Sequence, residues 1–223
     1  MNEKINEYLK DLIDLKNIKE KNTSIRALAY QLYENNGVVK RENVINFIKF
    51  LNQDERKILR NLGVKFGRYH IFLHRLFKPN AVSLRVLLWK NFHQKYLTLE
   101  PPKFGLNFFE DKKNINPNFM LMCGFENFNK YYVRIDILER LFLKIIDSNQ
   151  NKDIKLNSEM LNLLGCNKND FIKLIQNMNY KTFTKNNDLY FKYFPNKKMK
   201  KKLISKENNK ININNPFNAL RKI

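Results

Sequence analysis

The sequence predicts a mainly α chain: an N-terminal helical domain at residues 1–99, a small α+β domain at residues 119–195 and a basic tail at residues 196–223. Three observations lead to this prediction. Apolar residues repeat every 3.6 residues through the first part, and three prolines interrupt that pattern between residues 100 and 118. Short apolar runs then alternate with turn residues. We therefore expect residues 100–118 to form a linker between two domains.

Five helices are expected in the first domain. Asn52 and Glu55 have the spacing of a capping box at the start of the fourth helix, which Gly63 can end. Pro79 suits the first turn of a long fifth helix that is apolar around most of its circumference. The apolar faces of the first three helices are formed in turn by Ile5, Leu9, Leu12 and Ile13; by Ile25, Leu28 and Leu32, before Asn36-Gly37; and by Val44, Ile45, Ile48 and Leu51. The apolar residues of the fifth helix are Val82, Val86, Leu87, Trp89 and Phe92.

The second domain begins with two apolar runs, 119–125 and 131–133, that predict a small hairpin. Asp136 and Glu139 then have capping-box spacing at the start of a helix whose core face includes Leu138 and Phe142. A helix cap is also the simplest explanation of these two carboxylates, which could otherwise suggest an acid/base pair.

The order of the remaining elements is informative. A short strand at 154–156 precedes a helix from Ser158 to Gly165, a second helix at 168–179 and a hairpin at 180–194 that turns at Asn186-Asn187-Asp188. Helix, strand, helix, tight turn, helix and hairpin is the order of a winged-helix domain. The sequence therefore predicts a winged-helix-like domain here.

The charge of the chain is strongly positive and unevenly placed. The formal charge is +21, and residues 56–99 contain ten Lys or Arg, all three histidines and the single Trp, but no Asp or Glu. Folded surfaces normally mix charges of both signs, so a long basic and aromatic stretch is typical of a protein that binds a polyanion. Nucleic acid is the commonest such partner.

The candidate nucleic-acid-binding residues come from this stretch and from the winged-helix-like domain. Within Gly63–His70, two glycines accompany cations and aromatics that could approach a phosphate and stack on a base. The other interpretation of this segment is a helix end at Gly63 followed by a core strand through Phe66, Ile71 and Phe72. The full candidate set is Arg56, Arg60, Lys65, Arg68, Tyr69, His70, Arg75, Lys78, Arg85, Lys173, Gln176, Lys181 and Lys185, with Lys192 also on the wing.

Several kinds of chemistry find no support in the sequence. The six glycines form neither a P-loop nor a dinucleotide or nucleophile-elbow motif. His70 and His74 are spaced like paired zinc ligands but have no acid or Cys beside them, and Cys123 and Cys166 have no redox motif. No catalytic residue, metal or cofactor is therefore expected. Without a membrane-length apolar run or a signal peptide, we expect no membrane partner and a cytoplasmic location.

Two segments resemble a known family. The run LGVKFGRYHIFLHRLFKP, with the following helix that ends in LLW at Trp89, is similar to L-G-V-R-F-G-x-Y-H-x-F-L-x-x-L-x-K-P in long superfamily 2 ATP-dependent helicases of alphaproteobacteria, relatives of the mitochondrial RNA-degradosome helicase. CGFENFNKYYVRIDILERL resembles a second family segment, although Phe128 or Asn129 replaces its second glycine. The ending PFNAL resembles the family's P-F-A-A-L.

The resemblance implies the helical accessory region that follows the motor and helps to form the channel for the single strand. It implies strand- or motor-facing roles for Lys65, Arg68, Arg75 and Lys78. Both motor domains are absent from the chain, so the family's ATPase cannot be assigned to it. The resemblance implies motor domains, in cis or in trans, as partners.

Three functions follow as hypotheses. The first is a nucleic-acid-binding accessory region of a helicase that guides a strand or braces the motor, with single-stranded RNA favoured and DNA possible. The second is a free-standing winged-helix DNA-binding protein that depends on Lys173 and Gln176. The third is a structural module whose basic surface docks an acidic partner protein.

Overall fold

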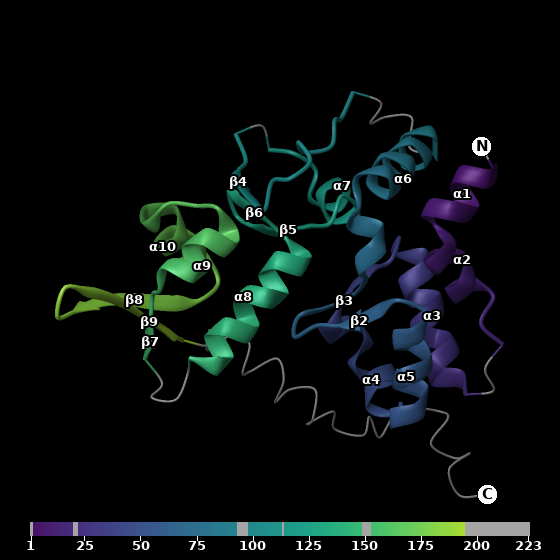
Figure 1. The fold of residues 1–223 in the computed structure, drawn as a ribbon, viewed down its shortest axis with the longest axis horizontal. Helices are drawn as coiled ribbons and strands as arrows, with labels where there is room; N and C mark the ends of the chain where they lie inside the picture. The colour runs from purple at the N-terminus through teal and green to yellow at the C-terminus, as the bar shows by residue number, and fades with distance from the viewer. Residues whose placement is uncertain (1, 20–21, 93–97, 113, 149–152, 195–223) are drawn as a thin grey trace, which may run out of the picture.

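The computed structural model describes residues 2–19, 22–92, 98–112, 114–148 and 153–194. It is a mixed α+β fold in which helices accompany three small antiparallel sheets. Figure 1 shows the chain running from the N-terminal helices to the β8–β9 hairpin at the opposite end of the long axis. The predicted basic tail lies outside the described residues.

The three sheets have the same strand order. In each, the strand that comes last in the chain lies in the middle and pairs antiparallel with the other two. The orders are β1-β3-β2, β4-β6-β5 and β7-β9-β8. The strands are β1 (Val38–Lys40), β2 (Val64–Phe66), β3 (His70–Leu73), β4 (Phe108–Glu110), β5 (Phe125–Phe128), β6 (Tyr131–Arg134), β7 (Ile154–Lys155), β8 (Tyr180–Lys185) and β9 (Asp188–Tyr193).

The helices are placed similarly around each of the three sheets. The helices are α1 (Asn2–Tyr8), α2 (Lys10–Lys16), α3 (Thr23–Glu34), η1 (Arg41–Val44), α4 (Ile45–Lys49), α5 (Gln53–Asn61), η2 (His74–Phe77), α6 (Pro79–Phe92), α7 (Pro117–Met122), α8 (Ile135–Asp147), α9 (Ser158–Leu164) and α10 (Lys168–Asn177). A helix lies directly before the first strand of each sheet (α3, α6 and α8), and one or more helices separate the first strand from the second. We call residues 23–73, 79–134 and 135–193 the first, second and third units.

Local sequence explains where these elements begin and end. A residue with positive φ stands directly before the second strand of every unit: Gly63 (87°), Gly124 (91°) and Asn179 (67°). Glycine and asparagine adopt this left-handed backbone more easily than other residues. Asn186 and Asn187 also have positive φ, which matches the two-residue turn that a tight hairpin requires.

The hydrophobic cores join the units. Ala81 and Leu84 of α6 pack in the core of the first unit, whereas Val82 and Val86 of the same helix pack against α7 and the second sheet. A smaller cluster contains Val38 and Phe72 from the first sheet and Ile135 from the start of α8. Because these clusters cross the unit boundaries, burial of apolar surface fixes how the units sit against one another.

Many predicted elements are confirmed. The capping box at Asn52 and Glu55 has both of its bonds, at 2.8 and 2.9 Å, and α6 begins at Pro79. The helices and the hairpin of the third unit lie close to their predicted ranges. The side chain that caps α9 belongs to Asn157, one residue before the predicted Ser158.

Other elements differ from the prediction. The segment predicted as an all-helical domain contains β1, β2 and β3, and the predicted linker contains β4, which pairs with β6. The apolar run that begins at Phe119 starts as helix α7, and only its last residue, Phe125, enters a hairpin with β6. Such short apolar segments fit either structure, and their partners far along the chain decide between them.

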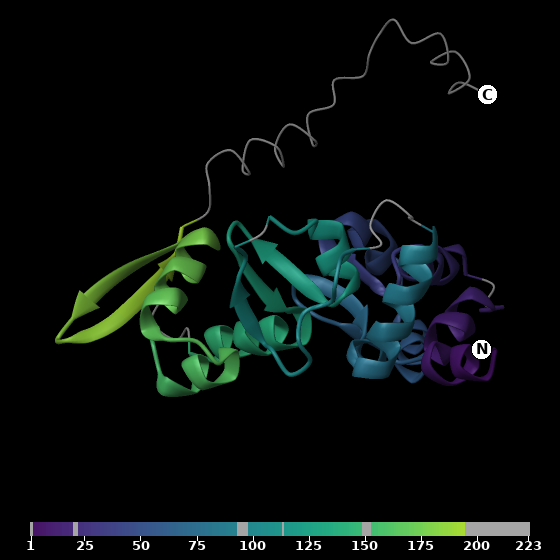
Figure 2. The same cartoon turned by 90° about the horizontal axis from the view of Figure 1, so that it is seen from above.

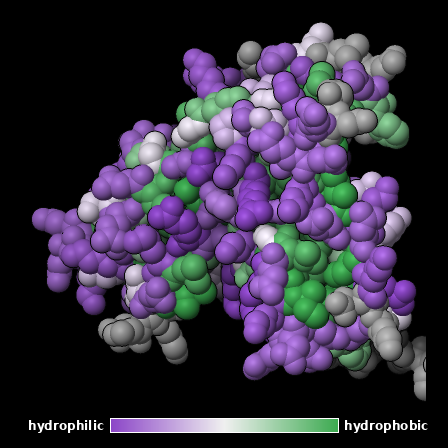
Figure 3. All heavy atoms as spheres, turned by 45° about the vertical axis from the view of Figure 1, so that its right-hand side comes forward, coloured by the Kyte–Doolittle hydropathy of each residue, from purple (hydrophilic) through white to green (hydrophobic). Residues whose placement is uncertain are grey.

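The overall shape is elongated. Figure 2 shows the β8–β9 hairpin extending away from the rest of the molecule, and Figure 3 shows a largely hydrophilic face interrupted by apolar patches. Among the described residues, no helix has the length and hydropathy needed to cross a membrane.

Candidate nucleic-acid interface

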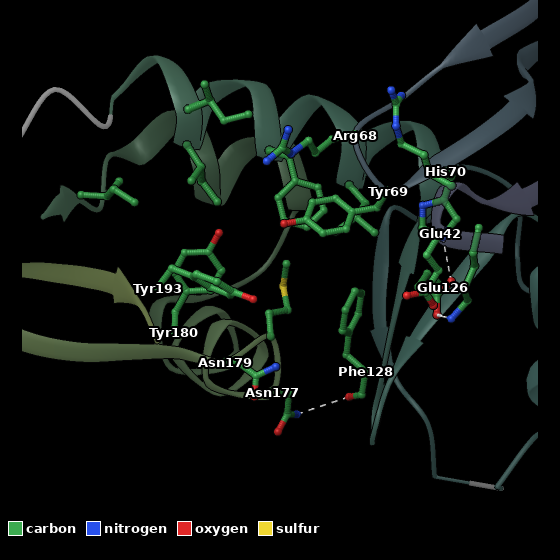
Figure 4. A pocket seen from close by; sticks show the side chains of 18 of the residues that line it. Glu42, Arg68, Tyr69, His70, Glu126, Phe128, Asn177, Asn179, Tyr180 and Tyr193 are labelled. Atoms are coloured by element: carbon green, nitrogen blue, oxygen red, sulfur yellow. Dashed lines mark hydrogen bonds and ion pairs between the residues drawn. The ribbon is translucent and has the colours of Figure 1, made fainter. Parts of the chain in front are cut away.

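A cavity of about 950 Å³ lies where the three units meet. One wall is the apolar face of α8, and the others come from the β2–β3 turn, the end of β1 with η1, and the adjoining ends of α10, β8 and β9. Figure 4 shows the lining side chains. Four of them are basic (Lys40, Arg41, Arg68 and Lys192) and five are aromatic (Tyr69, Phe128, Phe142, Tyr180 and Tyr193).

The aromatic rings form two opposing groups. Tyr69 from the β2–β3 turn lies against Phe142 of α8, with 4.0 Å between ring centroids. Tyr180 and Tyr193 are cross-strand partners on β8 and β9, with ring centroids 5.2 Å apart. Figure 4 shows this second pair across the cavity from Tyr69 and Phe128. The cavity therefore offers flat apolar surfaces on more than one wall.

At one end of the cavity, His70 is held between two carboxylates. Its side chain is only 3% exposed. Nε2 lies 2.8 Å from Oε2 of Glu126, and Nδ1 lies 3.2 Å from Oε1 of Glu139. Lys40 Nζ binds the other oxygen of Glu126 at 2.8 Å. A neutral imidazole has only one N–H, so an imidazole with an acceptor at each nitrogen is best satisfied as the imidazolium.

The electrostatics agree with this assignment. Burial alone would lower the pKa of His70, but hydrogen bonds to Glu126 and Glu139 and their negative charges outweigh it and raise that pKa. Burial would likewise raise the pKa of Glu126, whereas His70 and Lys40 bring it below its usual range. The three charges therefore stabilise one another in the interior.

Glu139 also binds the backbone of the β2–β3 turn. Its carboxylate accepts hydrogen bonds from the N–H groups of Arg68, Tyr69 (3.0 Å) and His70 (2.8 Å). A Cβ on Gly67 would lie 2.5 Å from Cδ of Glu139, so only glycine leaves room for this approach. We call Glu139 with the N–H groups of residues 68–70 and the ring of His70 the Glu139 latch.

The Glu139 latch corrects two predictions. Glu139 does not cap its own helix: the residue at the N-cap of α8 is Arg134, and no side chain caps that end, while Asp136 binds Arg134. The glycine-containing turn was predicted to bring its backbone to a phosphate, but its N–H groups hold a carboxylate of the same chain. The alternative interpretation, a helix end at Gly63 followed by core strands, describes β2 and β3 correctly.

Burial excludes His70 and Arg85 from the residues predicted to contact nucleic acid. His70 is enclosed by its carboxylates, as described above. Arg85 is 3% exposed, and its guanidinium donates to the backbone carbonyls of Asn36 (2.8 Å) and Leu76 (2.5 Å). Burial lowers the pKa of Arg85 to about 10. Its role is to bind the carbonyls where α3 and η2 end, not to contact a ligand at the surface.

Of the predicted residues, Arg68, Tyr69 and His70 line the cavity, together with Lys192 of the wing. Arg56 donates to the Ile48 carbonyl at 3.0 Å, and Arg75 pairs with Asp11 at 3.1 Å. The guanidinium of Arg60 lies over the Phe66 ring at 5.7 Å. Lys65 is exposed on β2, and Lys78 is exposed between η2 and α6.

The other predicted residues of the third unit are exposed but lie outside the cavity. Gln176 donates to the Thr182 hydroxyl at 3.1 Å, and Lys181 Nζ lies 4.2 Å from the centroid of Phe194. Lys173 and Lys185 face solvent. The predicted set therefore divides between the cavity and a separate exposed surface on α10 and the hairpin.

Sequence reasoning missed most of the cavity. Lys40 and Arg41 precede the acid-free stretch, and Phe128, Tyr180 and Tyr193 were treated only as hairpin residues. The basic pair Lys40-Arg41, directly after the apolar Val38-Val39, was a weak sequence signal for a binding residue at this position. Nothing in the local sequence indicates that Tyr193 faces a turn more than a hundred residues away, because the packing of the third unit brings them together.

Comparisons with protein-family models, with curated proteins and with solved structures each returned no match to this chain. The function is therefore argued from the residues themselves.

Proposed function

We propose that this chain is a nucleic-acid-binding module that holds a single strand in the cavity between its three units, and that it acts beside a helicase motor supplied in cis or in trans. The observation that supports the proposal most strongly is the lining of the cavity. Basic side chains that can bind phosphates surround aromatic rings on which bases can stack. The motor and the preference for RNA come from the resemblance of residues 62–89 and 123–141 to the helicase family.

The fold supports the same class of function. The strand order of each sheet, together with the helices before and within it, supports the proposal that each unit is a winged helix. We extend the single unit expected from the sequence to three in tandem, the second having one fewer described helix. Winged helices serve both as nucleic-acid readers and as braces between proteins, so the fold alone does not choose between these roles.

The charge distribution favours a strand over an acidic protein as the occupant. The carboxylates of Glu126 and Glu139 are already bound by His70, Lys40 and backbone N–H groups. Arg68 is exposed, Lys192 is half-exposed and pairs with Asp153 at 3.6 Å, and the exposed Glu42 also lines the cavity. A cavity that combines these charges with five aromatic rings suits bases as well as phosphates, whereas an acidic peptide would use the charges alone.

The test is binding of a labelled single-stranded RNA to the full chain, measured by fluorescence anisotropy over a series of salt concentrations. Replacing Arg68 and Lys192 together by Ala should weaken binding by about tenfold or more and lower the salt slope by about 0.7 per lost phosphate contact. Lys10→Ala is the control, because it removes an exposed charge from α2 far from the lining residues.

Three results would contradict the proposal. If the double variant binds with the affinity and salt slope of the original chain, the cavity is not the binding site. If the chain prefers a duplex DNA sequence and Lys173→Ala abolishes that preference, the exposed α10 surface carries the function instead. Failure to bind any nucleic acid at low salt would favour docking of an acidic protein.

A further inference from the structure

Three tyrosines of the cavity have a feature that base stacking does not require. Tyr69 comes from the β2–β3 turn, Tyr180 begins β8 and Tyr193 ends β9. Tyr180 is buried, while Tyr69 and Tyr193 are 43% and 47% exposed. Figure 4 shows Tyr180 and Tyr193 with their rings together on the wall opposite Arg68 and Tyr69. Phenylalanine would stack equally well at each position, so the hydroxyl groups need a separate explanation.

The three hydroxyls and Arg68 are close enough to influence one another. Burial raises the pKa of Tyr180, and Tyr69 and Tyr193 raise it further. Burial and Tyr193 also raise the pKa of Tyr69, while the charge and a hydrogen bond of Arg68 oppose this rise. The phenols of Tyr69 and Tyr180 therefore stay protonated at neutral pH, and each carries an O–H that can be donated. Figure 4 shows Tyr69 facing Tyr180 and Tyr193 across the cavity, so the hydroxyls lie around a common space.

We propose that Arg68 and the hydroxyls of Tyr69, Tyr180 and Tyr193 form a subsite for a phosphate monoester, the terminal phosphate of the bound strand. This inference rests on the proposed function, because the strand brings the phosphate to the cavity. A phosphodiester inside a strand offers two free oxygens, whereas a terminal phosphate offers three and a charge of about −1.5 to −2. Three hydroxyls and the forked guanidinium supply donors for all three oxygens.

The neighbouring charges are compatible with an anion at this place. Glu139 is near enough to Tyr69 to raise its pKa, but its carboxylate is held by three N–H groups and by His70. Glu126 is bound by His70 and Lys40. Lys192, on the same strand as Tyr193, pairs with Asp153 only at 3.6 Å. Glu42 also lines the cavity, at the His70 end in Figure 4. The positive charge beside the tyrosines therefore comes mainly from Arg68.

The experiment compares short oligouridines that differ only at their ends: a 5′ phosphate, a 3′ phosphate or hydroxyls at both ends. The full chain should bind one of the phosphorylated strands about tenfold more tightly than the unphosphorylated strand. The Tyr69→Phe and Tyr193→Phe double variant keeps both rings but removes two donors, so the ratio of its affinities for the phosphorylated and the unphosphorylated strand should fall from about tenfold to about one. Tyr190→Phe is the matched control, because Tyr190 lies on the same strand, stacks on Phe183 and does not line the cavity.

The outcomes separate this inference from the proposed function. If all three strands bind equally well, or if the double Phe variant keeps the preference, the phosphate subsite is refuted and strand binding stands. If no strand binds, the proposed function fails, and inorganic phosphate then tests the subsite directly. At matched ionic strength it should raise the unfolding temperature of the original chain and of Tyr190→Phe, but not that of the double variant. Equal shifts in all three proteins would overturn the subsite.

Discussion

The β2–β3 connection of the first unit and the β8–β9 connection of the third unit occupy the same place in the same strand order, yet they are used differently. The first joins strands of three and four residues, and its turn lies against α8, where Glu139 binds three of its N–H groups. The second joins strands of six residues and extends away from the molecule, as Figure 2 shows.

The residues at the two turns explain this difference. Gly67 leaves space for a carboxylate at the β2–β3 turn, which is thereby committed to holding the third unit. Asn186 and Asn187 adopt the positive φ that a tight two-residue turn requires. No hydrogen bond to another unit is described for them. A repeated topology thus carries one hairpin that joins units and one that extends away from the molecule.

Among variants that test the difference between the two connections, Glu139→Ala should have the largest effect on stability. It leaves three N–H groups and His70 without their shared acceptor, so we expect it to lower the free energy of unfolding by about 3–5 kcal/mol. In the third unit, Asp188→Ala removes an exposed ion pair with Lys155 and should cost less than about 1 kcal/mol. Urea unfolding of both variants measures the difference. Equal costs would mean that the Glu139 latch does not hold the units together.

Gly67→Ala should have a smaller effect, about 1–3 kcal/mol, because its Cβ would displace the Glu139 carboxylate. Gly165→Ala is the comparison, since Gly165 has positive φ but no neighbour within 4 Å of an added Cβ. Combined with Glu139→Ala, Gly67→Ala should cost less than it does alone, because the Glu139 carboxylate is absent and only the His70 carbonyl oxygen, 2.7 Å from the added Cβ, still opposes it. Full additivity in this double-mutant cycle would contradict the close-approach explanation.

The pH dependence of stability should be the smallest effect, and its sign follows from the pKa shifts. The pKa of His70 is raised by its carboxylates, so its stabilisation is complete below about pH 6.5 and is lost as pH rises through its folded value. The pKa of Glu126 is lowered, so its contribution is present above about pH 4.3 and is lost on acidification. Stability should therefore be greatest between these limits.

His70→Gln should remove the loss of stability on the alkaline side, because Gln does not titrate. The exposed His74→Gln should keep it. Denaturant unfolding of the three proteins at several pH values between about 5 and 9 checks this expectation. A slope that persists in His70→Gln would assign the titration to another group.

The sequence predicted the parts of this fold that depend on local chemistry. The capping box at Asn52, the start of α6 at Pro79 and the turn at Asn186 are set by residues within a few positions of one another. A core strand through Phe66, Ile71 and Phe72 was only an alternative interpretation, and β1 was missed, because His70–Leu73 becomes a central strand only by pairing with segments on both sides. Glu139 has the spacing of a capping-box residue, but its carboxylate binds the buried His70 ring and the backbone N–H groups of residues 68–70 instead of the start of its own helix.

The candidate site was predictable only in part. Arg68 and Tyr69 stood out because they lie in a stretch without acids. Tyr193 and Lys192 reach the cavity only because α10 and the β8–β9 hairpin pack in one core with α8, which no short sequence window contains. The same packing buried Arg85, whose charge had suggested a surface role.

The imidazole of His70 has a consequence for how this chain can be divided. One ring touches carboxylates on both sides of the junction between β6 and α8, where the strand ends at Arg134 and the helix begins at Ile135. A fragment that ended at this junction would keep Glu126 but expose the turn that Glu139 occupies. The apparent boundary between units is thus a poor place to cut, and the three units are expected to melt in a single cooperative transition.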